Sequence, residues 1–393
     1  MDAHSTMEME RRRQLYAELR LRPPPRESRY SGIEVLYGDK ETQTQVLVAR
    51  RTTDGERVAI KTFRIARDKI DEALNEAFVL RSMAGHPHVV RMLDVILSAD
   101  NSRVAMEFEY ANATMHEDVL RLTPRLPGPP TAGGEGGGGG MLTAYRIAAT
   151  EQVLSAVEYL HSVDVVHCDI KASNILVFYP RAAPVAARGV TELPVFKLAD
   201  FGVARLLGPA RRIEATHDIN PTGCRPPEVL LLMPLGPEID MWAVGCTLAW
   251  MLDPYRCPLK FFSDRPALSG KPVPISAQEE LCHIDRILGP IPASMRLRPI
   301  RHTPLQFEAR VYVPAPPSPA EELLYGFDAH FRHIPAAYRP LLRSLLQCDP
   351  GMRYAGRLPL SPRSPGNTLV PSPDTAALLR ELLEENPQSK TRK

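Results

Sequence analysis

The sequence has few cysteines, and none are spaced as redox or metal-binding pairs usually are. Six cysteines occur among 393 residues, and no two of them form a C-x-x-C pattern. That pattern is typical of zinc sites and of thioredoxin-like motifs. The amino-terminal segment is charged rather than apolar, so we expect no secretory signal peptide. Reduced thiols in a cytoplasmic or nuclear protein are therefore predicted.

Long hydrophobic runs and an excess of charge of one sign are also missing. The longest apolar run, residues 241–252, is too short to span a bilayer and is typical of a buried helix. The 48 Lys and Arg residues nearly balance the 46 Asp and Glu residues, which leaves a formal net charge of +2 at pH 7. We therefore expect a soluble protein without a nucleic-acid partner and without a membrane partner.

Proline, by contrast, is abundant. The 39 prolines are about a tenth of the chain, roughly twice the average usage, and they gather in segments that have little to bury. We predict a flexible extension over 1–29, a disordered Pro/Gly insertion at about 125–140, and a Pro/Ser-rich tail with a short helix over 357–393. The remaining residues, 30–356, are long enough for one large domain.

Hydrophobic periodicity predicts a sheet first and helices later. Apolar residues alternate from residue 30 to residue 60, and Asp54-Gly55 supplies a hairpin turn. Helical spacing over 70–83 predicts a helix packed on that sheet through Ile70, Leu74, Ala77 and Leu80. The remaining predicted elements are strands at 90–97 and 103–110 and helices at 142–161, 281–288 and 341–353.

Three polar residues lie between two apolar runs at 165–177. Asp169 can take the proton of an attacking hydroxyl, Lys171 can neutralise charge on a transferred phosphate, and Asn174 can hold a magnesium ion. A short polar run of this kind is also typical of an ordinary solvated turn. Further motifs in the chain therefore decide between the two interpretations.

Those motifs follow in order: V-A-I-K at 58–61, Glu76, D-F-G at 200–202 and P-P-E at 226–228. With the loop H-C-D-x-x-x-x-N, the set resembles eukaryotic protein kinases of the CMGC group, especially the cyclin-dependent Ser/Thr kinases. The resemblance implies an α+β, two-lobed kinase fold. Its N-lobe, at about 30–110, is a small antiparallel sheet with one helix, and its C-lobe, at about 111–356, is mainly helical.

The resemblance also implies ATP and Mg²⁺ as cofactors. Lys61, held by Glu76, would pair with the phosphates, and Asp200 would hold magnesium together with Asn174. His167 is expected to pack in the interior with Leu80 and Phe201. A buried ion pair is expected between Glu228 and Arg353.

The adenine site implied by the resemblance has apolar walls and a hinge. The walls would be Val46, Ala59 and Leu176, and the hinge would be Glu109 to Ala111. Phe108 is the expected gatekeeper, although Met106 fits nearly as well.

The implied activity is transfer of the γ-phosphate of ATP to protein Ser/Thr-Pro sites. Lys171 favours Ser/Thr over Tyr as the acceptor. Thr216 is a candidate activation-segment phosphosite, with Arg205 as a phosphate-binding residue. The same resemblance implies a cyclin-like activator, although the helix carrying Glu76 does not repeat the cyclin-binding motif.

The sequence departs from the family pattern at the phosphate loop and at the phosphate-gripping arginines. Asp39, Glu41 and Thr44 stand where the family has glycines that approach the phosphates. The missing glycines favour an alternative function, a kinase-fold scaffold with weak nucleotide binding. Cys168 and Asn75 replace two arginines that grip a phosphorylated activation loop, so a phosphate on Thr216 would find fewer partners.

Overall fold

A computed structural model describes most of the predicted kinase domain. It covers residues 29–38, 44–64, 69–83, 85–97, 103–122, 139–180, 193–208, 210–213, 219–221, 223–253, 276–296 and 326–353. Several predictions lie outside the described residues: most of the extension 1–29, nearly all of the insertion 125–140, the tail 357–393, Thr216, and the acids Asp39 and Glu41.

The amino-terminal lobe is a five-stranded antiparallel sheet of order β1-β2-β3-β5-β4. The turn at Asp54-Gly55 joins β2 to β3, and Gly55 has the positive φ of 73° that this hairpin requires. The predicted sheet is confirmed, with β4 beginning two residues later than expected. The strands are β1 (Tyr30–Gly38), β2 (Gln45–Arg51), β3 (Arg57–Arg64), β4 (Met92–Leu97) and β5 (Arg103–Glu109).

The first strand differs from its prediction in one respect. Alternation of Ile33, Val35 and Tyr37 predicts one buried and one exposed face, yet these side chains are 55–65% exposed and so is Leu36 at 60%. β1 is the edge strand and pairs with β2 alone. The strand is therefore held by its ladder hydrogen bonds rather than by side-chain burial.

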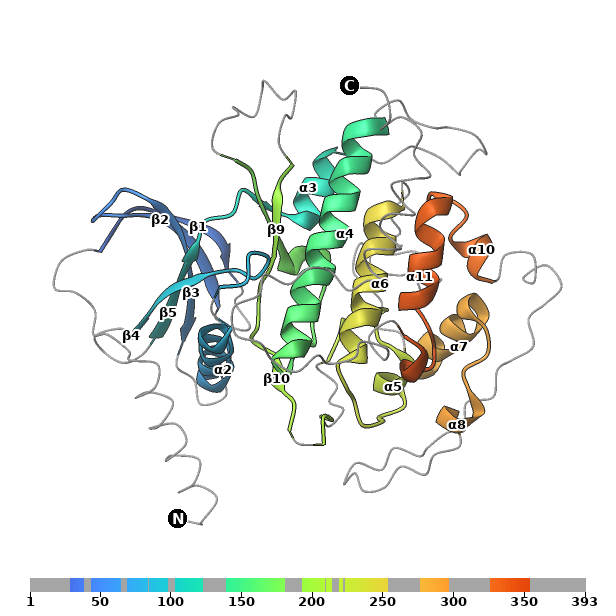
Figure 1. Ribbon diagram of the computed structural model, residues 1–393. Helices are drawn as coiled ribbons and strands as arrows, with labels where there is room; N and C mark the ends of the chain where they lie inside the picture. The colour runs from blue at the N-terminus through green and yellow to red at the C-terminus, as the bar shows by residue number, and fades with distance from the viewer. Residues whose placement is uncertain are drawn as a thin grey trace, which may run out of the picture.

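One helix, α2 (Lys69–Ser82), packs against this sheet (Figure 1). Ala73, Ala77 and Leu80 are buried on its inner face. The side chains of Ile70 and Leu74, which the sequence places on the same face, lie outside the described residues. The helix that carries Glu76 is thus present and packed as predicted.

The carboxy-terminal lobe is built around two long helices, α4 and α6, which lie side by side (Figure 1). Every residue of α6 after Glu238 is buried, which confirms that the apolar run 241–252 is a core helix. The helices are α3 (Met115–Leu122), α4 (Gly139–Ser162), α5 (Pro227–Leu230), α6 (Glu238–Leu252), α7 (Ala277–Leu288), α8 (Ala293–Arg296), α10 (Phe327–His330) and α11 (Arg339–Leu345).

Local sequence signals explain where α7 begins and ends. Ser276 and Glu279 form a capping box at its first turn, in which each side chain accepts the other residue's backbone N–H. Gly289 follows the last turn with a φ of 95°, a conformation that favours glycine. This helix begins earlier than the predicted 281–288.

The helix predicted over 341–353 is wrong in extent. α11 runs from Arg339 to Leu345, and the chain then turns into a 3₁₀ helix, η3 (Pro350–Met352). Pro350 lacks the N–H that a continuing helix needs, and Asp349 caps the new turn by accepting a hydrogen bond from Gly351 N at 2.8 Å.

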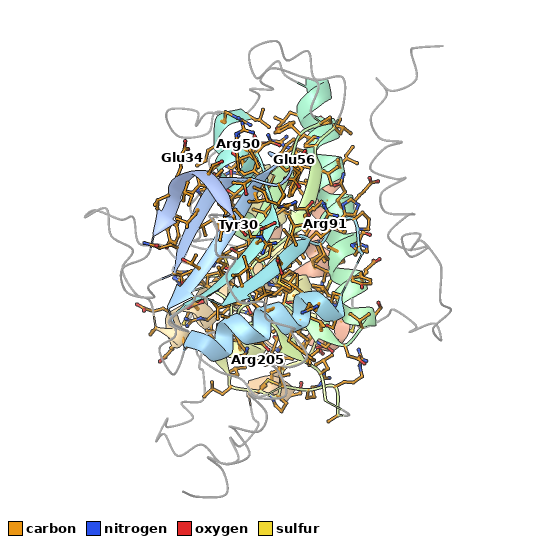
Figure 2. The ribbon with its side chains drawn as sticks, turned by 90° about the vertical axis from the view of Figure 1, so that its left-hand side faces the viewer. Tyr30, Glu34, Arg50, Glu56, Arg91 and Arg205 are labelled. Atoms are coloured by element: carbon orange, nitrogen blue, oxygen red, sulfur yellow. The ribbon has the colours of Figure 1, made fainter. Side chains whose placement is uncertain are left out.

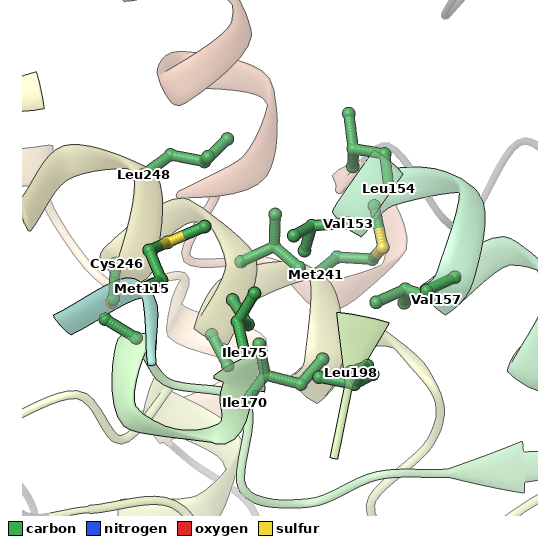
Figure 3. Close-up of a cluster of buried hydrophobic side chains, with 14 of the residues drawn as sticks. Met115, Val153, Leu154, Val157, Ile170, Ile175, Leu198, Met241, Cys246 and Leu248 are labelled. Atoms are coloured by element: carbon green, nitrogen blue, oxygen red, sulfur yellow. The ribbon is translucent and has the colours of Figure 1, made fainter. Parts of the chain in front are cut away.

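Two small sheets connect the helical core to the polar loop at 167–174. β7 (Val165–Val166) pairs with β10 (Arg205–Leu206), and β6 (Ala113–Thr114), β8 (Ile175–Phe178) and β9 (Val195–Leu198) form the second sheet. Figure 3 shows Ile170 and Ile175, from the loop and β8, among the buried side chains of α4 and α6. The polar loop is therefore fixed at both ends by core residues. Across the described ranges, no helix is long and apolar enough to cross a membrane.

Candidate active site

The three polar residues predicted between 165 and 177 lie together. Lys171 Nζ is 2.6 Å from Asp169 Oδ2. Asn174, at the end of the 3₁₀ turn η1 (Ala172–Asn174), donates from Nδ2 to Asp169 Oδ2 at 3.0 Å and to Asp169 O at 2.9 Å. The carboxylate is thus oriented by a cation and an amide, which is the arrangement expected of a group that must face a substrate hydroxyl.

Asp240 binds the backbone of this loop through its carboxylate. Its two carboxylate oxygens accept the backbone N–H of His167 at 2.8 Å and of Cys168 at 2.9 Å. His161 Nε2 lies 2.9 Å from the same carboxylate, and Asp240 is fully buried. Asp240 belongs to no motif, and its one sequence signal is that it is an acid in the first turn of a largely apolar helix.

His167 is an internal packing residue, as predicted. It is fully buried, and its ring centroid lies 4.7 Å from that of Phe201. Its Nε2 lies 3.0 Å from Ala199 O, and its Nδ1 accepts the N–H of Asp169 at 3.2 Å. Leu80 is also buried. The ring thereby connects the polar loop at 167–174 to the segment that carries Asp200.

Lys61 joins two acids that are far apart in sequence. Its Nζ lies 2.7 Å from Glu76 Oε2 and 2.7 Å from Asp200 Oδ1. The Glu76 side chain is 1% exposed, whereas that of Asp200 is 45% exposed. Strand β3, helix α2 and the segment after β9 therefore meet at one ammonium group.

Burial and charge act against each other on these three groups. Burial alone would lower the pKa of Lys61, but the charges of Glu76 and Asp200 outweigh it and raise that pKa. Burial would raise the pKa of Asp200, but the Lys61 charge lowers it overall. For the buried Glu76 carboxyl, burial exceeds the effect of Lys61 and the pKa is raised. Lys61 and Asp200 are therefore charged at neutral pH.

Two of the three predicted adenine walls, Val46 and Ala59, share one face of the five-stranded sheet. Val46 is directly opposite Lys61 on the neighbouring strand, and Ala59 lies two residues from Lys61, so all three project from the same face. Leu47, Ala49, Val58 and Ile60 alternate with them and pack on the opposite face. Leu176 is partly buried on β8 and packs against the main core. The structure thus puts these walls on the Lys61 side of the sheet and on β8.

The predicted hinge begins where β5 ends. Glu109 is the last residue of that strand, and Ala111 lies between it and β6. Lys197 Nζ contacts both carboxylate oxygens of Glu109 at 2.8 and 2.9 Å, a contact that sequence reasoning missed because Lys197 has no motif of its own. This ion pair fixes the hinge to β9, three residues before Asp200.

Both gatekeeper candidates lie on the Lys61 face of β5. Phe108 is opposite Ala59, and Met106 is opposite Lys61 and fully buried. Each candidate is followed by a residue of the same strand, Glu107 after Met106 and Glu109 after Phe108. The choice of Phe108 over Met106 therefore stays a prediction.

The oxygen donors suited to magnesium are at adjacent strand ends. Asn174 immediately precedes β8 and Asp200 follows β9, and Ala199 N donates to Asn174 O at 2.8 Å. Carboxylate and amide oxygens fit Mg²⁺, which usually has one or two protein ligands together with phosphates and waters. Within the part of the chain described, no cluster of three or more His, Cys, Asp or Glu side chains could hold a metal. Residues Asn174 and Asp200 thus fit a magnesium that is bound together with a nucleotide.

The predicted ion pair of the large lobe is confirmed. Arg353 is fully buried, and its two terminal nitrogens contact the two carboxylate oxygens of Glu228, one of them at 2.8 Å. Its Nε donates to Gln347 O at 2.7 Å, and its guanidinium carbon lies 4.9 Å from the ring of Trp242. This pair ties the segment around P-P-E to α6 and to the end of α11.

Comparison with known proteins identifies the family. A sequence profile described as "Protein kinase domain" matches residues 42–264, more than half of the chain. The chain therefore belongs to the protein kinase family, with the two-lobed α+β fold that the motifs predict.

Its curated relatives are cyclin-dependent and cyclin-dependent-like kinases. The chain is 28% identical to cyclin-dependent kinase 11.2 of Caenorhabditis elegans over 217 residues, which are 53% of this chain and 29% of that protein. It is 26% identical to cyclin-dependent kinase-like 5 of Mus musculus over 314 residues, 79% of this chain and 28% of the relative. Identity to cyclin-dependent kinase D-1 of Arabidopsis thaliana is 30% over 231 residues, 57% and 49% of the two chains. The chain thus spans half or less of the length of these relatives.

Proposed function

We propose that this chain is an ATP- and Mg²⁺-dependent Ser/Thr protein kinase that prefers Ser or Thr followed by proline. The observation that supports it most is the convergence of Lys61 on Glu76 and Asp200, each at 2.7 Å. A lysine held between two acids is positioned for phosphates and metal together. The relatives are cyclin-dependent kinases, which supports protein substrates.

Each residue predicted to bind nucleotide or metal receives a role in this proposal. Lys61, positioned by Glu76, binds the inner phosphates, and Asp200 with Asn174 supplies the metal ligands. Val46, Ala59 and Leu176 enclose the adenine, while the backbone from Glu109 to Ala111 binds its polar edge. Magnesium, when bound, neutralises phosphate charge and aligns the reacting phosphoryl group.

Asp169 acts on the substrate hydroxyl. Its Oδ2 is bound by Lys171 and Asn174, so we assign Oδ1 to the incoming hydroxyl proton. The hydroxyl oxygen bonds to the γ-phosphorus as the bond to the bridging oxygen breaks, and ADP is released. Lys171 stabilises the negative charge on the transferred phosphoryl group.

A transfer assay with three peptides tests this proposal. Peptides that differ at one place, Ser-Pro, Ser-Ala and Tyr-Pro, are incubated with the protein, labelled ATP and magnesium. We expect transfer to Ser-Pro to exceed transfer to the other two, and to fall at least a thousandfold in Asp169→Asn. Equal transfer to Ser-Pro and Ser-Ala would contradict proline preference, and equal transfer to Tyr-Pro would contradict Ser/Thr specificity.

The alternative function is a kinase-fold scaffold, favoured by the loop between β1 and β2. Gly38 pairs with Gln45, so the loop that should cover the phosphates contains Asp39, Glu41 and Thr44. Carboxylates there would repel a nucleotide. Equal and negligible transfer by the wild type and by Asp169→Asn would favour the scaffold.

A cyclin-like activator is the partner that the relatives' names suggest. Such an activator would stabilise the arrangement of α2 in which Glu76 reaches Lys61. The structure of the single chain already has this contact at 2.7 Å. Full activity of the purified single chain would contradict cyclin dependence.

A further inference from the structure

Helix α2 contacts the segment after Asp200 through two consecutive residues. Glu76 accepts a hydrogen bond from the backbone N–H of Phe201. Asn75 donates from Nδ2 to Ala204 O at 2.9 Å and, more weakly, to Gly202 O at 3.4 Å. The same turn of helix that positions Lys61 therefore also holds the start of the activation segment, through a neutral amide.

The other two positions that would bind a phosphate are also occupied by protein contacts. Arg205 donates from Nη1 to Val203 O at 2.8 Å and to Ala204 O at 3.2 Å. Figure 2 shows Arg205 just below α2, in agreement with the shared acceptor on Ala204. Cys168 is fully buried in an apolar cluster with Val166 and other core residues.

Direct contacts continue along the segment toward residue 213. Strand β10 pairs with β7, and Leu207 N donates to Asp164 O at 2.8 Å. Ile213 and Leu235 exchange both backbone hydrogen bonds, at 2.8 and 2.9 Å. Each of these contacts uses backbone groups, so none depends on a charged modification.

We propose that Asn75 is a positioning residue that holds the start of the activation segment, residues 201–208, on α2, so that this part of the segment needs no phosphate to be ordered. In this arrangement the amide of Asn75 and the guanidinium of Arg205 converge on one carbonyl oxygen, that of Ala204. The active arrangement of Lys61, Glu76 and Asp200 is then set by the fold itself. The consequence for catalysis rests on the proposed kinase function; the structural part does not.

Hydrogen exchange of the unliganded full chain tests the structural part. Asn75→Ala removes the side-chain hydrogen bonds to Gly202 O and Ala204 O. We therefore expect about tenfold faster exchange of the backbone N–H groups of Ala204 and Leu207. Exchange at Ile213 and Leu235 should stay unchanged. The control Ser82→Ala, which removes a hydroxyl on the same helix that donates to Val79 O at 2.7 Å, should leave all four amides unchanged.

Phosphate dependence is tested in the same measurement. Treatment with phosphatase, or the substitution Thr216→Ala, should leave exchange at Ala204 and Leu207 within twofold of the untreated wild type. Unchanged exchange in Asn75→Ala would overturn the proposal. Faster exchange after phosphatase treatment, equal to that expected for Asn75→Ala, would overturn it as well.

Transfer assays then separate this proposal from the proposed function. We expect kcat for Ser-Pro peptide to fall about tenfold in Asn75→Ala, with partial rescue by Asn75→Gln, and to be unaffected by phosphatase. Asp169→Asn should lose transfer with normal exchange. If the wild type transfers no phosphate, the proposed function fails while the exchange result still decides the role of Asn75.

Discussion

Replacing Glu76 with glutamine should uncouple Lys61 from α2 without unfolding the protein. The Glu76 side chain is 1% exposed and lies 2.7 Å from Lys61 Nζ. Removing one member of a buried ion pair lowers the free energy of unfolding by about 3–5 kcal/mol when the other member is left unpaired. Lys61 keeps Asp200 at 2.7 Å, so we expect the lower end, about 3 kcal/mol. The glutamine carbonyl can still accept the N–H of Phe201, which preserves the backbone contact.

Because Lys61 is then no longer held by α2 against the phosphates, we expect kcat/KM for ATP to fall; a loss of ~3 kcal/mol in the transition state corresponds to about 150-fold. The assay is steady-state phosphate transfer with ATP as the varied substrate, and circular dichroism verifies the fold. Asp328→Asn is the matched control, since its side chain is 72% exposed and contacts only the surface residue Arg343 among the ion pairs described. A loss below fivefold, similar to that of the control, would refute the idea that Lys61 depends on Glu76.

Three further predictions concern other parts of the structure. Arg353→Met leaves the buried Glu228 carboxylate without its partner and should lower the free energy of unfolding, measured by urea titration, by about 3–5 kcal/mol. The double variant with Glu228→Gln should lose less free energy of unfolding than the sum of the losses of the two single variants. Asp240→Asn replaces one of the two carboxylate oxygens that accept the loop N–H groups by an NH2 donor. We therefore expect the free energy of unfolding in the same titration to fall by about 1–3 kcal/mol, together with a reduced kcat. An unchanged midpoint would contradict the role of Asp240. Burial, followed by the charge of His88, lowers the pKa of His86 from 6.5 to about 4, so stability should be full above pH 6.5 and fall as the pH drops toward 4. His86→Phe should flatten this dependence, and an equal slope in both proteins would count against it.

The sequence predicts the candidate catalytic and binding residues better than the residues that hold them in place. Lys61, Asp169 and Asp200 stand in short motifs whose chemistry is specific, and the structure brings Lys61 and Asp200 into contact across 139 residues of chain. Asn75 and Lys197 have no motif, because a single amide or lysine acquires its role from tertiary placement. Their contacts join α2 to Ala204 and β9 to the hinge, and no local pattern encodes either distance.

The predicted burial of β1 and the predicted extent of α11 were inaccurate for a similar reason. Period-two alternation in β1 indicates a strand but does not say whether another layer covers it, and Val35 is 65% exposed. In α11 the apolar spacing continues past Leu345, yet Pro350 and its Asp349 cap change the backbone conformation. Proline lacks the N–H that a helix running on to residue 353 would need.

Nucleotide-dependent thermal stability tests most directly whether these side chains form one magnesium-nucleotide site. The melting temperature of the full chain is measured with ATP alone, with magnesium alone and with both, for the wild type and for Lys61→Met. We predict a rise with both ligands together, which disappears in Lys61→Met. No rise in the wild type, or an equal rise in Lys61→Met, would contradict the convergence of Lys61, Glu76 and Asp200 on a bound nucleotide.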